Sequence, residues 1–356
     1  MAFAAIPAVG GEIAEAVRSF ARSDDANATG TVKKMAPADD AAAQFRLGTQ
    51  FARGQGVKQS YPDAVFWFRK AAAQGHAEAQ NSLGVRYEKG QGVARDYREA
   101  AAWYRKAALQ GFALAQDNLS DLYTKGLGVA KDDVSAYLWL SLASANGETA
   151  AAGKRAQIES RIAGEKRAEV NYRLGTAYEI GEGVARDHQR AVQWFLKAAT
   201  QGHAMAQYQL AASFDKGSGA AQDYRQAAVW FEKAARQGHA RAQSAIGYMY
   251  DIGQGVAADP LRAIDWYEKA AAKGDAFAQH NLGQMHVTGR GVTQSDLQAH
   301  KWFSIAEAHR DNDKDKTSAV AADARKLIET RMTAEQIAEG RRLAREWMKA
   351  HATGYF

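Results

Sequence analysis

Seven of the eight tryptophans in this 356-residue chain recur in register, and their spacing constrains the fold more than any other feature of the sequence. Successive members are 36 residues apart, apart from one step of 55 residues: Trp67, Trp103, Trp139, Trp194, Trp230, Trp266 and Trp302. A period of this size indicates supersecondary units that bury their apolar faces only against their neighbours. The sequence therefore predicts a stack of seven tandem repeats, with the tryptophans as the energetic centre of the core.

Each repeat carries the markers of two helices joined by a glycine loop. The loop reads G-x-G-V in six repeats, starting at Gly54 in the first, and has a weaker form at Gly217 to Ala220 in repeat five. Before the loop, an aliphatic residue and a mostly aromatic residue stand four positions apart, which places them on one helical face. Between them, a small residue such as Gly84 allows a second helix to approach closely. A serine or aspartate, six residues after the first loop glycine, is a good N-cap for that second helix, so each unit is predicted to be a helix hairpin.

The combined pattern A-x-A-Q-x-x-L-G-x-x-Y-x-x-G-x-G-V, then A-x-x-W-[FY]-x-K-A-A-x-x-G-[HD]-A, resembles the Sel-one-like repeat of the tetratricopeptide superfamily. The segment from Ala77 to Val93 matches it almost letter for letter, and the resemblance covers seven units between about residues 43 and 310. It implies an all-α fold, a right-handed αα-superhelix (solenoid) of seven helix hairpins, used as an adaptor. In such arrays the recurring residues build the hairpin and the varying residues carry recognition.

Two segments depart from the repeat and resemble each other. Ile-Glu-Ser-Arg at 158–161 recurs as Ile-Glu-Thr-Arg at 328–331. Near the C-terminus this element is expected to cap the stack, with Thr333 and Gln336 as a capping box. In the middle it is expected to lengthen the first helix of repeat four. The expected organisation is a flexible N-terminal segment at 1–42, repeats one to three at 43–150, an inserted cap-like helix at 151–170, repeats four to seven at 171–310, and C-terminal capping helices at 311–356.

Composition excludes several classes of site. The chain has no cysteine, which rules out disulfides and thiolate metal ligands. No stretch approaches the ~20 apolar residues of a membrane helix, so no membrane span is expected. The apolar start, Met1 to Val9, lacks a preceding Lys or Arg and is too short for a convincing signal peptide. The sequence identifies neither a compartment nor an oligomeric state.

The net charge of +6 does not indicate a nucleic-acid partner. Basic residues such as Lys70 and Lys233 recur near the ends of the second helices, where cations favour the helix dipole. Acidic residues collect on the first helices, two positions before the loop, and would repel phosphates. RNA binding stays open as an alternative, because pentatricopeptide arrays have a similar period and bind RNA. Salt-sensitive retention on homopolymer RNA would reveal it.

The first helices supply the candidate binding residues. Family geometry would place aromatic and acidic side chains of these helices on the concave surface, where they suit a protein or peptide partner with basic and apolar side chains. The predicted partner-binding residues are Tyr172, Tyr208, Tyr248, Met249, Glu88, Glu179, Asp215 and Asp251. The alternative is that these side chains only cover the neighbouring helix.

Catalytic signals are weak. Ser213 and Lys216 form an S-x-x-K pattern, but its S-D-N and K-T-G companions are missing. His280 and His286 lack the i, i+4 spacing of a helical zinc pair, and the glycine loops lack the context of a phosphate cradle. We therefore expect no catalytic residue, metal or cofactor. A weak hydrolase acting on β-lactam or peptidoglycan-like substrates stays as the alternative, to be tested with a chromogenic lactam and Ser213→Ala.

Overall fold

The computed structural model describes residues 39–308 and 316–351, which form helices and connecting turns with no strand in either range. Residues 1–38 of the expected N-terminal segment 1–42 lie outside this description. The chain divides into two compact units, one ending at Asp187 and the other beginning at His188. The all-α fold of seven successive helix pairs with C-terminal capping helices is confirmed.

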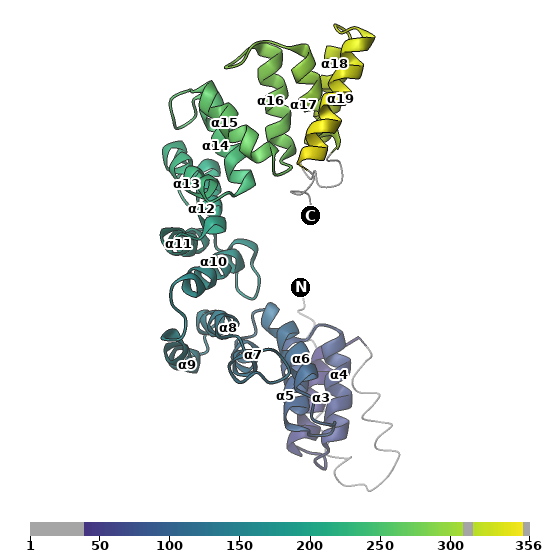
Figure 1. The fold of residues 1–356 in the computed structure, drawn as a ribbon. Helices are drawn as coiled ribbons and strands as arrows, with labels where there is room; N and C mark the ends of the chain where they lie inside the picture. The colour runs from purple at the N-terminus through teal and green to yellow at the C-terminus, as the bar shows by residue number, and fades with distance from the viewer. Residues whose placement is uncertain (1–38, 309–315, 352–356) are drawn as a thin grey trace, which may run out of the picture. The chain divides into compact units, whose positions relative to one another are not determined.

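The first unit holds three complete hairpins followed by two further helices (Figure 1). Its helices are α3 (Ala41–Arg53), α4 (Tyr61–Ala73), α5 (Ala77–Lys89), α6 (Tyr97–Leu109), α7 (Ala113–Lys125), α8 (Asp133–Ala145), α9 (Ala150–Glu159) and α10 (Glu165–Ile180). The two helices of each hairpin pack against each other, and the second helix also contacts the first helix of the next hairpin. Both α9 and α10 pack against α8.

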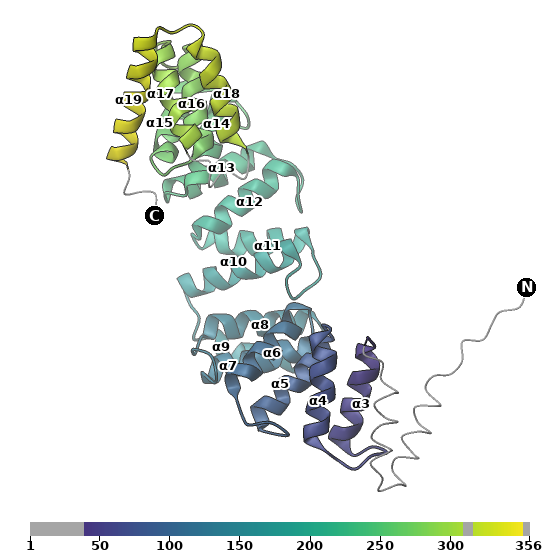
Figure 2. The same ribbon diagram turned by 90° about the vertical axis from the view of Figure 1, so that its right-hand side faces the viewer.

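The second unit continues the same arrangement (Figure 2). Its helices are α11 (His188–Thr200), α12 (Ala204–Lys216), α13 (Tyr224–Arg236), α14 (Ala240–Ile252), α15 (Pro260–Ala271), α16 (Ala276–Thr288), α17 (Asp296–Ala308), α18 (Thr317–Glu329) and α19 (Ala334–Ala350). The pairs α12–α13, α14–α15 and α16–α17 are hairpins, and α18 and α19 both pack against α17. These last two helices cover the apolar face that the final hairpin would otherwise expose.

Repeat two shows how the sequence makes a hairpin. Gly90 ends α5 in the left-handed conformation, with φ of +68°, which a glycine adopts at little cost. The Asp96 carboxylate then accepts hydrogen bonds from the backbone N–H groups of Arg98 and Glu99 at 2.8 and 3.1 Å, which starts α6. The small residue expected between the helices is also required, because a Cβ on Gly84 would lie 2.6 Å from the ring of Tyr104.

The second glycine of the loop sets the contact between successive hairpins. A Cβ on Gly92 would lie 2.4 Å from the backbone carbonyl of Tyr61, at the start of the preceding second helix. Gly128 lies against Tyr97 in the same way, with a distance of 2.2 Å. Both glycines also have positive φ, +77° and +69°. Backbone therefore meets backbone at these repeat boundaries, and no other residue fits there.

The tryptophans are less uniformly buried than their register suggests. Four of the seven are buried, namely Trp67, Trp139, Trp230 and Trp302. Three are half-buried, namely Trp103, Trp194 and Trp266. The fully buried aromatic side chain is often the next residue, as with Tyr104 and Tyr267, which are both 0% exposed. In five of the seven repeats a lysine three positions later covers the tryptophan ring. Lys106 Nζ, for example, lies 3.9 Å from the Trp103 ring centroid. The half-buried tryptophans thus lie at the rim of the hairpin, and the aromatic residue after each of them fills the centre.

The inserted segment forms a helix of its own and only slightly extends repeat four. Helix α9 is anchored by the buried side chain of Ile158, and Lys154 Nζ bridges Asp117 and Asp121 of α7 at 2.7 and 3.0 Å. Gly164, with φ of +55°, separates α9 from α10, which has 16 residues against 13 in most first helices. The first helix of repeat four is thus lengthened as expected, but by only three residues, because this glycine turn separates it from α9.

Candidate functional site

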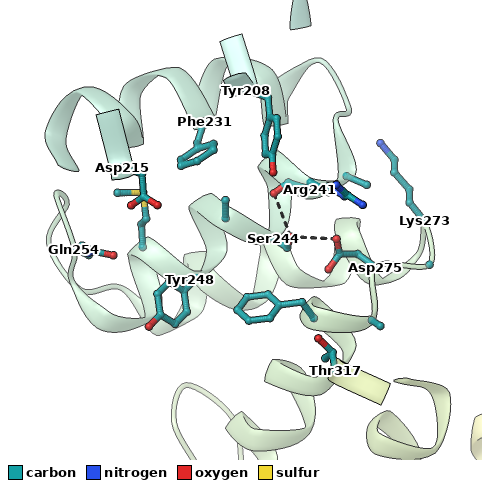
Figure 3. A pocket seen from close by; sticks show the side chains of 16 residues that line it. Tyr208, Asp215, Phe231, Arg241, Ser244, Tyr248, Gln254, Lys273, Asp275 and Thr317 are labelled. Atoms are coloured by element: carbon teal, nitrogen blue, oxygen red, sulfur yellow. Dashed lines mark hydrogen bonds between the residues drawn. The ribbon is translucent and has the colours of Figure 1, made fainter. Parts of the chain in front are cut away.

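A cavity of about 500 Å³ opens on the second unit, among helices α12, α13, α14 and the start of α16 (Figure 3). The side chains that define its chemistry are Tyr208, Asp215, Arg241, Tyr248, Met249 and Lys273. Four of these belong to the eight residues predicted from the sequence to bind a partner. Its volume lies within the range of ~300–1,000 Å³ typical of ligand pockets.

Two tyrosines supply the aromatic wall. Tyr208 of α12 stacks on the His239 ring with centroids 4.5 Å apart, and its other neighbour is Phe231 at 5.7 Å. Tyr248 of α14 meets Phe277 of α16 edge-on at 5.9 Å and is 38% exposed. Tyr208 is therefore held between hairpins, whereas Tyr248 leaves part of its side chain exposed to solvent.

Asp215 marks the acidic end of the cavity. It lies in the last turn of α12, half-buried beside Tyr248 and Gln254 in Figure 3. Within residues 39–308 and 316–351, no group donates a hydrogen bond to its carboxylate. Burial raises the pKa of this carboxyl, and the neighbouring Lys216 opposes the shift. A carboxylate in this condition gains by pairing with a cation from outside.

The opposite end of the cavity holds two cations. Arg241 and Lys273 lie there in Figure 3, together with Ser244 and Asp275. The Asp275 carboxylate caps α16 by accepting from Ala278 N at 2.9 Å, and Ser244 Oγ donates to it at 3.2 Å. Burial raises the pKa of Asp275, and these hydrogen bonds oppose the shift. Neither cation forms an ion pair with any described residue.

The two other predicted residues of this unit, Met249 and Asp251, are buried within the repeat packing. Met249 is only 2% exposed and forms part of the cavity floor. Asp251 is 6% exposed, and Arg290 of the next loop donates to its carboxylate at 2.7 Å. Burial raises the pKa of Asp251, with Arg290 opposing the shift. Asp251 therefore ties two repeats together and does not line the cavity.

The three remaining predicted residues lie in the first unit. Glu88 is half-buried on α5 and accepts a hydrogen bond from the Tyr104 hydroxyl at 2.6 Å. Tyr172 and Glu179 are half-buried on α10. The carboxylates that share one slot of the repeat thus differ in role. Glu88 and Asp251 have partners, whereas Asp215 has none in the part of the chain that the structure describes.

The sequence reading missed Arg241, Ser244, Lys273 and Asp275. Arg241 and Ser244 belong to the first helix of repeat six, but they are neither aromatic nor acidic, and the prediction rested on residues of those two kinds. Lys273 was detectable, since it stands where other repeats have an amide side chain, as at Gln110 and Gln237.

Nothing in the described ranges supports chemistry at the S-x-x-K pattern. Ser213 is 5% exposed, and its hydroxyl donates to the Gln209 carbonyl of its own helix at 3.0 Å. No cluster of three metal-ligating side chains occurs in residues 39–308 and 316–351. Among the helices described, none is long and apolar enough to cross a membrane.

Comparison with known proteins gives matches along most of the chain. The Sel1 repeat family model matches residues 41–76, 77–112, 113–148, 168–203, 204–239, 240–275 and 276–309. The solved structure of a protective antigen of uropathogenic Escherichia coli, displaying an SLR fold, is 26% identical, with 97% of this chain and 92% of that chain covered and a TM-score of 0.38. The structure of a Sel1 repeat protein from Oxalobacter formigenes is 27% identical, with 90% and 89% covered and a TM-score of 0.42. Curated proteins contain no match to the chain.

Proposed function

Because the chain belongs to the Sel1 repeat family, whose members generally act in protein–protein interaction, we propose that it is a non-enzymatic adaptor that binds a peptide or protein segment in the cavity of the second unit. The segment carries a basic side chain, which pairs with Asp215, and apolar side chains, which cover Tyr208 and Tyr248. No cofactor is needed for this role.

The unpaired Asp215 carboxylate is the observation that carries the proposal. A half-buried charge without a partner is unfavourable in the free protein, so selection for stability alone would replace it. Pairing with a lysine or arginine of a partner would cost little further desolvation of this carboxylate, because it is already partly buried. The pair would form a charge-assisted hydrogen bond, which is stronger than a neutral one.

The aromatic wall supports the same partner class. Tyrosine is enriched in protein interfaces because it offers a large apolar face and a polar hydroxyl. The exposed face of Tyr248, beside the Met249 floor, suits an aliphatic side chain adjacent to the basic one. For the first unit, Tyr172, Glu88 and Glu179 stay predictions, and Asp251 has a structural role in repeat packing.

The test is a selection of binding peptides from a random 12-residue library, followed by fluorescence anisotropy with the enriched peptides. We expect them to be rich in Lys or Arg beside apolar residues. Asp215→Asn combined with Tyr248→Ala should weaken binding at least tenfold, which corresponds to ~1.4 kcal/mol. Tyr208 is left intact, because its stacking on His239 also holds two hairpins together.

The matched control is Tyr224→Ala, which removes a half-buried tyrosine from α13 that does not line the cavity. This variant should bind the peptides as the native chain does. Peptides that bind the double variant with native affinity would contradict the proposed site. Asp215→Asn alone should also raise the thermal midpoint slightly, because it removes a charge whose burial is unfavourable.

A further inference from the structure

A pair of amide side chains closes most hairpins of this chain. The second member stands 30 residues after the first, near the end of the second helix, and donates its side-chain N–H to the side-chain oxygen of the first. The pairs are Gln74–Gln44 at 2.8 Å, Gln110–Gln80 at 2.8 Å, Asn146–Gln116 at 3.0 Å and Gln237–Gln207 at 2.7 Å. Each first member is buried.

The first amide of the pair also connects neighbouring hairpins. Gln80 Nε2 donates to the backbone carbonyl of Ala72 in the preceding repeat at 3.1 Å, and Gln207 Nε2 donates to Ala199 at the same distance. The side-chain amide therefore uses both ends: its nitrogen bonds the previous repeat and its oxygen bonds the end of its own hairpin. We call this arrangement the amide clamp.

Repeat six breaks the amide clamp at one position. Gln243 still donates to the carbonyl of Ala235 at 3.0 Å, but the second member is Lys273. Its ammonium donates to the Gly238 carbonyl instead, and Gln243 Oε1 is buried without a hydrogen-bond partner among the residues that the structure describes. A buried acceptor without a donor lowers stability. The lysine is thus unfavourable for the hairpin, which indicates that it serves another purpose.

Lys273 lines the cavity at its basic end. It joins Arg241 at the end of the cavity remote from Asp215 (Figure 3). The nearby Asp275 carboxylate carries at most one negative charge against these two positive charges, and among the described residues it forms no ion pair with either cation. Burial lowers the pKa of the adjacent His239 ring, and the charges of Arg241 and Lys273 add to this shift.

We infer that Arg241 and Lys273 form a subsite for a carboxylate, so that the partner segment carries an acidic group at one end and a basic side chain at the other, with apolar residues between them. This inference rests on the proposed function, since it places the second charge of the same segment. Arginine binds a carboxylate through two parallel N–H groups, and lysine adds a point charge. The carboxylate comes either from an Asp or Glu side chain or from a chain terminus.

The test uses peptides enriched by selection on the native chain, resynthesised with a free or an amidated C-terminus and with each Glu or Asp changed to Gln or Asn. Lys273→Gln should weaken binding of the acidic peptides about tenfold and leave the neutralised peptides unaffected. It should also keep or raise the thermal midpoint, because glutamine restores the amide clamp to Gln243. Lys269→Gln, on the preceding helix α15 and outside the cavity, is the matched control for binding and should leave the affinity for the acidic peptides unchanged.

The peptide forms distinguish the source of the carboxylate. Loss of binding on amidation assigns the subsite to a chain terminus, and loss on changing Glu or Asp assigns it to a side chain. The inference would be overturned if the enriched peptides bind without needing a carboxylate, or if Lys273→Gln binds them as tightly as the native chain does. In either case the proposed function would still hold if the variant with both Asp215→Asn and Tyr248→Ala fails to bind the peptides. A lower thermal midpoint in Lys273→Gln would show that the lysine is structural. If no peptide is enriched on the native chain, both proposals fail.

Discussion

Two tyrosines occupy the same slot of the repeat but have opposite hydrogen-bonding states, which predicts opposite effects of removing their hydroxyl groups. Tyr104 and Tyr267 are both fully buried. The Tyr104 hydroxyl donates to Glu88 at 2.6 Å, whereas the Tyr267 hydroxyl has no hydrogen-bond partner within residues 39–308 and 316–351. The reason is the acidic residue 16 positions earlier: Asp251 is one methylene shorter than Glu88, and its carboxylate is paired with Arg290.

The magnitudes follow from these surroundings. Tyr104→Phe removes a hydrogen bond to a charged group, worth ~1.5–3 kcal/mol, and the half-exposed Glu88 places the loss near the lower end, about 1.5 kcal/mol. Tyr267→Phe removes a buried hydroxyl that pays a desolvation penalty of ~1–3 kcal/mol, so we expect a gain of about 1 kcal/mol. The two variants should therefore differ by roughly 2.5 kcal/mol.

The assay is equilibrium urea unfolding combined with hydrogen exchange measured by mass spectrometry. Exchange reports the local opening of α5–α6 and of α14–α15 separately, which matters because repeat arrays need not unfold as one unit. We expect faster exchange around Tyr104 in Tyr104→Phe and slower exchange around Tyr267 in Tyr267→Phe. Equal destabilisation by both substitutions would refute the reasoning, because it would mean that the two hydroxyls are equally satisfied.

Two further predictions concern packing and pH. Gly84→Ala should lower the free energy of unfolding by ~1–3 kcal/mol, because its Cβ would meet the Tyr104 ring at 2.6 Å. A Cβ on Gly153 of α9 would meet nothing within 4 Å, so Gly153→Ala should raise the free energy of unfolding by ~0.5–1 kcal/mol. Urea midpoints of the two variants that move in the same direction would contradict this prediction. Burial lowers the pKa of His280 and of His300, so as the pH falls through ~6.5 the unfolded chain binds protons that the folded chain does not. We therefore expect the thermal midpoint of the second unit to decrease over this pH range, and to decrease less in His280→Leu. Equal decreases in the native chain and the variant would argue against this prediction.

The hairpins could be predicted from the sequence because local rules determine them. Positive-φ glycines, aspartate N-caps and a small residue at the helix contact each leave a signature at a fixed distance from the loop, and each has the expected geometry in repeat two. The capping box of Thr333 and Gln336 is confirmed for the same reason. Burial was harder to predict, because Trp103 and Tyr104 are adjacent and only the helix rotation decides which of them points inward.

The candidate site was predictable only in part. Tyr208, Asp215 and Tyr248 could be found because they stand at periodic positions of the first helices, and the cavity brings them together. The basic end could not be found by that route, since Lys273 is a departure from the repeat and its effect on Gln243 appears only when the hydrogen bonds are known. Whether a carboxylate is paired depends on the side chains that extend to it from the next repeat. Arg290 reaches Asp251 in this way, and no described side chain does so for Asp215.

The glycine contacts at the repeat boundaries make each hairpin an interchangeable module. Gly92 and Gly128 hold successive hairpins at a separation set by main-chain atoms, so the step from one to the next is independent of the side chains on the exposed faces. Exposed residues can therefore change, as Lys273 has done, without altering the register of the array. A whole unit of 36 residues, such as 77–112, could likewise be duplicated or exchanged with its contacts preserved, so that new binding surfaces arise by rearranging existing parts.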